Sequence, residues 1–321
     1  MDFTLEFPDR DIKILQITDM QVIDSSQQRS PDRLRQEEYE KWLPETKEKN
    51  LYRYIRELVL RTSPDLIIIT GDITYGEFDD SGKSLEGFID FMDSFGVPWA
   101  PVYGNHDNET YIGIEKQNAM YESSKHCIFK KGNVFGNGNY SIAMKRGEKI
   151  VRTICMMDSN GCGKLGIAQG FREDQLEWLK NTSKECDAPV FCCFHIPTKD
   201  FLDAYIAAGY QTKSDDLDSS EYYELSVDKK AKEGDFGKKC EAFCGYSAPI
   251  LPILKASRVD GVFAGHYHKI NLSVKYVGIR FTMGLKTGLY DYHDKDAMGG
   301  TLITLCGNDF SVRHEYCTVA D

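Results

Sequence analysis

Short apolar runs recur along the chain, and most of them end at a polar or charged residue. Five such runs occupy residues 12–17, 66–69, 101–103, 190–194 and 259–264. Continuous apolar runs of this length, rich in β-branched residues, are typical of strands that are buried on both faces of a sheet. The pattern therefore predicts at least five core strands spread over most of the chain.

Helical spacing appears between these predicted strands. Apolar residues recur every three or four positions within 52–59, 85–92 and 171–181. Strands that alternate with helices indicate an α/β layer fold.

The C-terminal part has a different pattern, with apolar runs separated by short turns. The runs at 272–276, 278–283, 301–305 and 310–316 predict successive antiparallel strands that complete a sheet. We therefore expect one domain over residues 1–321, folded as a four-layer αββα sandwich of two mixed β-sheets flanked by helices.

Two segments are polar and lack clear periodicity, namely residues 21–50 and 200–246. Between residues 211 and 245 there are nine acidic and six basic side chains. A long polar stretch between two strands is typical of a lid or a substrate-binding loop, and equally of a solvated insertion. Both interpretations of the segment at about 200–246 stay open at this point.

Composition and charge narrow the function classes. Hydrophobic residues make up 41% of the chain and charged residues 28%, with a formal net charge of −11 and a pI of about 5.2. An acidic surface repels polyanions, which argues against binding of long nucleic acids.

The same sequence features bear on the cellular compartment. The chain begins without a basic-then-apolar leader, and its apolar runs are shorter than the ~20 residues of a membrane span. The ten cysteines are scattered without a CxxC pair, which favours buried free thiols, with adjacent Cys192 and Cys193 facing opposite sides of one strand. We expect a cytoplasmic protein without a membrane partner. The sequence does not indicate an oligomeric state.

Candidate chemistry lies at the ends of the predicted strands. The five core runs lead to Asp19, Asp72, Asn105, His195 and His266. Ligand sites in open α/β sheets gather at the carboxyl ends of strands, so these five side chains are expected to converge. Carboxylate, amide and imidazole groups are the donors that bind divalent cations.

Two details strengthen this metal-site hypothesis. His266 and His268 are two residues apart, so on an extended stretch both face the same side and could bind two neighbouring metals. One strand-end Asp or His alone is more often a cap or a structural group. The run Gly104–Asp107 and the ordered set of five are much more specific.

With these motifs in place, the chain resembles the calcineurin-like metallophosphoesterase superfamily. The motifs of that superfamily are D-x-H, G-D, G-N-H-D/E, a lone His and G-H-x-H. They appear here in the same order as Asp19-Met20-Gln21, Gly71-Asp72, Gly104-Asn105-His106-Asp107, His195 and Gly265-His266-Tyr267-His268. The stretches 194–197 and 278–288 are similar to the purple-acid-phosphatase-like branch.

The resemblance implies a role for each residue. Asp72 would bridge two metals, Asp19 and His268 would bind the first, and Asn105, His195 and His266 would bind the second. His106 would face the substrate, stabilise the phosphoryl charge and donate a proton to the leaving oxygen, while Asp107 would orient His106.

Gln21 departs from the family pattern, because it takes the place of the histidine in D-x-H. An amide oxygen is a harder and weaker ligand than imidazole, so Gln21 would bind the first metal weakly or contact only a metal-bound water. We expect the protein to bind two divalent metal ions. Mn or Fe is the expected metal, with Zn or Mg as alternatives.

The function that these features favour is phosphoester hydrolysis, by a phosphatase or a phosphodiesterase, of a small phosphorylated substrate. Two alternatives stay open. One is a metal-poor binding module on the same fold that has lost activity, for which Gln21 is the motivation. The other is a different two-metal hydrolase, such as an amidase or a nuclease acting on short nucleotides.

Overall fold

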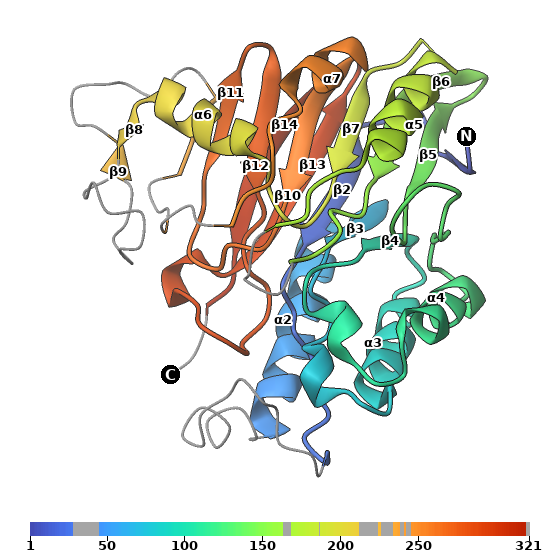
Figure 1. Cartoon of the computed structure of the whole chain (residues 1–321), viewed down its shortest axis with the longest axis vertical. Coiled ribbons are helices and arrows are strands. Elements are labelled where there is room, and N and C mark those ends of the chain that lie inside the picture. Colours follow the sequence, from blue (N-terminus) through green and yellow to red (C-terminus); the bar gives the residue numbers. More distant parts are fainter. Residues whose placement is uncertain are drawn as a thin grey trace.

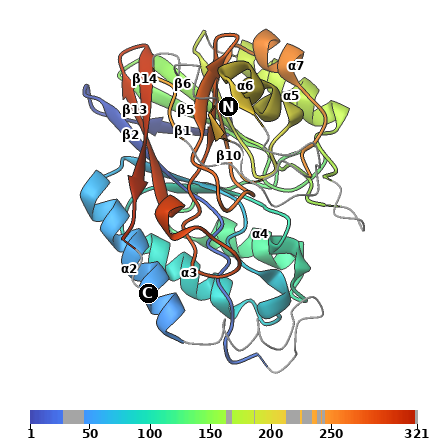
Figure 2. The same ribbon diagram turned by 90° about the vertical axis from the view of Figure 1, so that its left-hand side faces the viewer.

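The computed structural model describes residues 1–27, 45–162, 168–185, 187–211, 224–225, 234–237, 241 and 245–318. Two β-sheets lie face to face, with helices on both outer sides (Figures 1 and 2). This arrangement confirms the predicted αββα sandwich.

The larger sheet has seven strands in the order β1-β5-β6-β7-β10-β12-β11. They are β1 (Phe3–Glu6), β5 (Tyr140–Arg146), β6 (Lys149–Met156), β7 (Val190–Cys193), β10 (Val259–Ala264), β12 (Ile279–Met283) and β11 (Ser273–Tyr276). Strands β6, β7, β10 and β12 run parallel, whereas β5 and β11 are antiparallel to their neighbours β6 and β12. The sheet is therefore mixed, with a parallel centre.

The smaller sheet has five strands in the order β14-β13-β2-β3-β4. They are β14 (Asp309–Tyr316), β13 (Gly299–Cys306), β2 (Ile12–Ile17), β3 (Leu66–Thr70) and β4 (Trp99–Val102). Strands β2, β3 and β4 are parallel, and β13 is antiparallel to both β2 and β14. A separate two-stranded ribbon joins β8 (Tyr210–Gln211) and β9 (Glu224–Leu225).

Helices cover the outer face of each sheet. Helix α2 (Glu45–Thr62) contacts β2 and β13, and α3 (Lys83–Asp93) contacts α4 (Ile114–Ser123). On the larger sheet, α6 (Lys199–Ala208) contacts β11, while α7 (Leu251–Ala256) contacts β10 and α5 (Glu173–Lys184). The described residues also form three 3-10 turns, η1 (Gly76–Phe78), η2 (Asp107–Glu109) and η3 (Lys295–Ala297).

The core lies on both faces of the larger sheet. One cluster fills the space between the two sheets and extends beneath α2 and α3, and a second packs between the larger sheet and α5 to α7. Cys193 belongs to the first cluster and Cys192 to the second, which confirms that these adjacent thiols face opposite sides of β7. Burial on both faces explains why β7 is continuously apolar.

The structure differs from the sequence-based expectation in three places. The strands β1, β5 and β6 were not predicted: β1 is only four residues long with polar residues at alternate positions, β5 has a short apolar run that ends in Lys-Arg, and an arginine interrupts β6. The four C-terminal strands do not complete one sheet: β11 and β12 join the larger sheet, and β13 and β14 join the smaller one. The polar segment 200–246 begins inside helix α6, whose Phe201 and Tyr205 are buried.

Most of that polar segment beyond residue 211, and residues 28–44, lie outside the described residues, so the expected lid stays a prediction.

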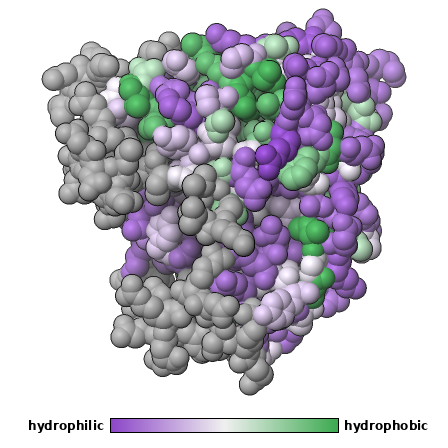
Figure 3. Space-filling model, in the orientation of Figure 1, coloured by the Kyte–Doolittle hydropathy of each residue, from purple (hydrophilic) through white to green (hydrophobic). Residues whose placement is uncertain are grey.

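Figure 3 shows one face of the molecule, where hydrophilic groups predominate and apolar groups form smaller patches between them. Among the described helices, none has the length and apolar character that a membrane crossing requires.

A buried arginine links the two sheets. The Arg152 side chain is only 1% exposed, pairs with Asp260 at the start of β10, and stacks 4.1 Å from the centre of the Phe191 ring. Its guanidinium also lies 5.3 Å from the ring of Phe310 in the smaller sheet. Burial lowers the pKa of Arg152 and raises that of Asp260, so each charge depends on the other.

We expect Asp260→Asn to lower the free energy of unfolding by about 2 kcal/mol, because it leaves a buried guanidinium without its counter-ion. Urea denaturation measures this change. The control is Glu57→Gln, which breaks an ion pair between half-exposed Arg53 and Glu57 and should cost less than about 0.5 kcal/mol. Equal small effects of the two substitutions would contradict this account of Arg152.

Candidate metal centre

The predicted ligands come from the carboxyl ends of strands in both sheets. Asp19, Asp72 and Asn105 follow the parallel strands β2, β3 and β4 of the smaller sheet. His195 and His266 follow the parallel strands β7 and β10 of the larger sheet. Both sheets therefore direct their strand ends toward one place, as the sequence predicts.

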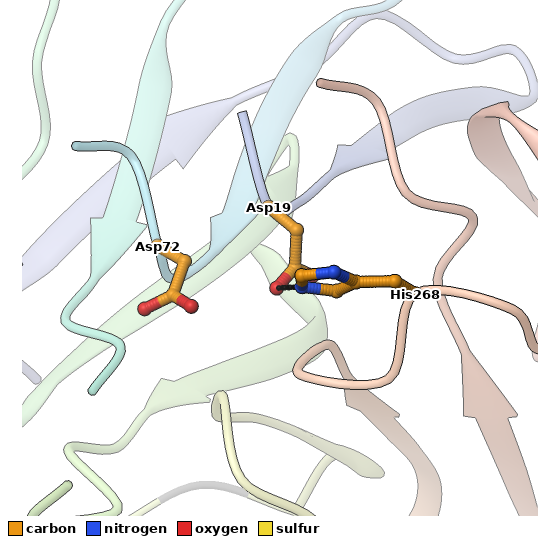
Figure 4. Close-up of side chains that lie close together, drawn as sticks. All are labelled: Asp19, Asp72 and His268. Carbon is orange, nitrogen blue, oxygen red and sulfur yellow. Dashed lines mark ion pairs between the residues drawn. The ribbon is translucent and has the colours of Figure 1, made fainter. Parts of the chain in front are cut away.

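One part of this place, which we call the first half-site, consists of Asp19, Asp72 and His268. Their donor atoms all lie within 4.8 Å of one another, and the three residues are buried. His268 Nε2 lies 3.3 Å from Asp19 Oδ1, as the dashed line in Figure 4 marks. His268 Nδ1 lies 2.9 Å from the carbonyl oxygen of Tyr292, which directs Nε2 toward the carboxylate.

The other part, the second half-site, consists of Asp72, Asn105, His195 and His266. His195 Nε2 lies 3.3 Å from Asp72 Oδ2 and 3.1 Å from Asn105 Oδ1. His266 Nδ1 lies 2.8 Å from the same Asn105 oxygen. The six predicted donors thus form two adjoining groups that share Asp72.

The backbone at the ligands adopts an uncommon conformation. Asp19, Gln21, Asp72 and His266 all have positive φ angles, between 50° and 79°. For residues other than glycine this region costs of order 1–3 kcal/mol each, and such residues cluster at functional sites. The strain is consistent with selection for ligand geometry rather than for stability.

Glycines beside the ligands allow close packing. A Cβ on Gly71 would lie 2.6 Å from the ring of His195, and a Cβ on Gly104 would overlap the Asp72 carboxylate. The G-D and G-N motifs therefore need glycine because a ligand side chain occupies the space of the missing Cβ.

The donor groups influence one another electrostatically. Burial alone would raise the pKa of Asp72, but the charges of His195 and His106 hold it well below its usual range. Burial opposes the charge of His195, yet Asp72 raises the pKa of His195 to about 9. Burial, reinforced by the charge of His195, lowers the pKa of His266 to about 3. The site without metal thus holds a proton on His195 at neutral pH.

His106 lies beside the shared carboxylate but uses its backbone there. Its amide N–H donates to Asp72 Oδ1 over 2.9 Å, and its ring stacks 4.3 Å from the ring of Tyr75. His106 Nδ1 lies 2.8 Å from Glu109 Oε2, so Nδ1 carries a proton that it donates to this carboxylate.

The expected orienting role of Asp107 differs from what the structure shows. The Asp107 carboxylate accepts hydrogen bonds from the backbone N–H groups of Gly104, Asp72 and Thr74. It holds the loops after β3 and β4 together, while Glu109 orients the His106 ring. Burial and the nearby Asp72 charge raise the pKa of Asp107 to about 7.

The side-chain amide oxygen of Gln21 accepts a hydrogen bond from a buried lysine. The buried Lys286 Nζ donates to Gln21 Oε1 over 2.6 Å and to the carbonyl oxygen of Asp19 over 3.0 Å. Lys286 follows β12 and lies beside Thr18 in a β-bridge. Burial lowers its pKa from the usual value.

The part of the chain that carries these motifs matches a known protein family. A model of the family described as calcineurin-like phosphoesterases matches residues 12–269. The chain belongs to this family.

Two relatives from Arabidopsis thaliana are named as probable inactive purple acid phosphatases. Number 28 is 29% identical over 220 residues, which is 59% of this chain and 54% of that protein. Number 29 is 23% identical over 312 residues, 88% of this chain and 72% of that protein. The chain thus aligns with only about half the length of the first of these relatives.

A solved structure with 11% identity is also similar, with a TM-score of 0.52 and coverage of 95% of this chain and 99% of that chain. At this identity the likeness supports the sandwich fold alone.

The residues of this family member fit divalent metal ions. Asp19 Oδ1 is buried and faces only the imidazole of His268, a group that binds metals through the same nitrogen. Carboxylate, amide and imidazole donors suit Mn, Fe, Zn or Mg better than a soft metal. The identity of the ion stays a prediction.

A surface pocket of about 510 Å³ adjoins the second half-site. Gly104 and Asn108 line one side of it, and Asp158, Asn160 and Phe135 line another. Burial raises the pKa of Asp158 to about 6. The pocket is mostly polar, and its lining residue Gly104 directly precedes Asn105 in the chain.

Several site residues have only weak sequence signals. Glu109 lies three positions after His106, a spacing that a short helical turn brings together. Asp158 follows β6 at a strand end, but that strand was not predicted. Lys286 lies in the stretch 278–288, which resembled the family branch without suggesting any role for the lysine.

The His195 proton gives a testable prediction. A metal ligand must be neutral imidazole, so metal binding at pH 7.5 should release about one proton, and affinity should rise with pH up to about 9. Calorimetry of Mn²⁺ binding in buffers of different ionisation enthalpy measures the protons released.

The control is His266→Asn, because His266 is already neutral at pH 7.5 and should contribute no proton. His195→Asn should abolish the release. A wild-type protein that releases no proton on binding Mn²⁺ at pH 7.5 would show that the Asp72–His195 pairing is not as described.

Proposed function

We propose that this protein is a metal-dependent phosphoester hydrolase that acts on a small phosphorylated substrate through a dinuclear metal centre. The observation that carries the proposal is the convergence of six donor residues in two half-sites that share Asp72. Two divalent metals held by these residues would supply an activated water and neutralise charge on the phosphate oxygens.

The chain's own residues supply the remaining steps. The Asp72 carboxylate belongs to both half-sites and fixes the distance between them. In the second half-site, Asn105 and His195 fix the directions of the donor atoms. The His106 ring is held by Tyr75 and Glu109, and in its doubly protonated form Nε2 would donate to a phosphate oxygen or give a proton to the leaving oxygen.

Charge and pocket shape bear on the substrate. A net charge of −11 disfavours long polyanions, so the phosphate would be recognised locally by the site itself. The pocket beside Asn105 offers amides, a buried carboxylate at Asp158 and the half-exposed ring of Phe135. These groups favour a leaving group that carries hydroxyls, from a monoester or a diester.

A binding module without activity is the second candidate. Two observations favour it: Gln21 stands where a histidine ligand is usual, and the two Arabidopsis relatives are named as probable inactive. Against it, the second half-site is complete and His106 retains its oriented ring. We therefore prefer the hydrolase.

The test compares two substitutions in Mn²⁺-supplemented protein on a model monoester and a model diester. Asp72→Asn should lose both bound metal and hydrolysis, because it removes the carboxylate that joins the half-sites. His106→Ala should keep its metal content and lower the rate of hydrolysis by roughly 10²- to 10⁴-fold, since only acid catalysis and charge stabilisation are lost.

The control is His126→Ala, which removes a partly buried histidine after α4 and should leave hydrolysis unchanged. If wild type binds Mn²⁺ but hydrolyses neither ester faster than Asp72→Asn, the hydrolase proposal fails and the binding module replaces it.

A further inference from the structure

A lysine ammonium is built into the first half-site. Lys286 is fully buried, and its Nζ donates to Gln21 Oε1 and to the Asp19 carbonyl oxygen. The acidic groups that act on it are Asp19, Asp291, Asp72 and Glu241. A fixed positive charge thus already lies among the carboxylates that a first metal would use.

The backbone holds this lysine firmly in place. Lys286 forms β-bridges with Thr18 and Met298, and the N–H of Thr287 donates to the Thr18 carbonyl over 2.9 Å. The N–H of Gly288 also donates to the Asp19 carbonyl over 3.2 Å. The ammonium is therefore a fixed part of the site and not the mobile end of a surface side chain.

The hydrogen bond between Lys286 and Gln21 limits how Gln21 can interact with a metal. An ammonium can only donate, so the atom of Gln21 that faces it at 2.6 Å is the oxygen. The remaining amide nitrogen, Nε2, is buried without a partner, and an amide N–H₂ group has no lone pair for a metal. The hydrogen bond from Lys286 takes one of the two lone pairs of Gln21 Oε1 and draws electron density from that oxygen, so Gln21 is a weaker metal ligand than its position suggests.

We propose that Lys286 is an internal counter-cation of the first half-site, which weakens Gln21 as a metal ligand and leaves the first metal weakly held and exchangeable. The second half-site, with Asn105, His195 and His266, retains its metal. The first metal then enters only when metal is abundant, with Asp19, Asp72 and His268 as its ligands.

The charge balance supports this ranking of the two half-sites. At the first half-site, an ammonium beside Asp19 repels an incoming divalent ion and neutralises part of the carboxylate charge that attracts it. The second half-site has four donor residues, Asp72, Asn105, His195 and His266, whereas the first has three besides Gln21. The neighbouring lysine and the smaller donor set therefore both weaken the first half-site.

The inference rests on the proposed function, and the experiment separates the two. Mn²⁺ is titrated into the full chain, with affinities from calorimetry and the number of bound ions and their coupling from electron paramagnetic resonance. Wild type, Lys286→Met, Gln21→His and the double variant Gln21→His/Lys286→Met form a cycle.

We expect wild type to bind one ion tightly and a second at least about tenfold more weakly, a range typical of groups around a metal site. Lys286→Met should tighten the second binding event roughly 10- to 100-fold and produce the spectrum of a coupled ion pair. Gln21→His alone should gain little while the ammonium stays, and the double variant should bind the second ion most tightly.

Two further variants serve as controls. Lys286→Arg keeps the positive charge and should stay close to wild type, whereas Lys199→Met removes an exposed lysine paired with Asp203 and should change nothing. If Lys286→Met does not fold, Lys286→Gln, which removes the charge but keeps a polar group, takes its place.

Two ions of equal affinity in wild type, or an unchanged or weaker second ion in the neutral Lys286 variants, would overturn the inference and leave the hydrolase proposal standing. Absence of any bound Mn²⁺ in wild type would overturn both, because the second half-site would then hold no metal.

Discussion

Two buried carboxylates, Asp19 and Asp72, dominate the electrostatics of this molecule. Negative charge that is removed from water must be paired with positive charge or with donors. Four neighbours of the pair supply one or the other: His195 and His268 contact the carboxylates, Lys286 lies beside Asp19, and the His106 backbone donates to Asp72. The rest of the site can be understood as the arrangement that keeps these charges in place.

The two sheets bring the buried carboxylates and their partners together. Each sheet has a parallel region whose strands end at the same edge, and the sandwich brings the two edges together. Asp107 ties the loops after β3 and β4 by accepting three backbone hydrogen bonds, and the positive φ angles at Asp19 and Asp72 show that the backbone bends sharply there. Stability of the layers is therefore coupled to the geometry of the donors.

Much of this could be predicted from the sequence, because it depends on local pattern. Runs of apolar residues located β2, β3, β4, β7 and β10, and the polar residue after each run gave the donors. Contacts between distant segments could not be predicted in the same way. Gln21 and Lys286 are 265 positions apart, and only the packing of the segment after β12 against Thr18 brings them together. The pairing of Glu109 with His106 likewise needed the observed turn after β4.

The central claim is that metal binds where the two sheets meet. Anomalous X-ray diffraction from crystals soaked in Mn²⁺ tests it most directly. The account predicts a strong anomalous peak among Asp72, Asn105, His195 and His266, and a weaker peak beside Asp19 and His268 that grows with Mn²⁺ concentration. An ordered ion bound elsewhere, with no peak among those four side chains, would contradict it.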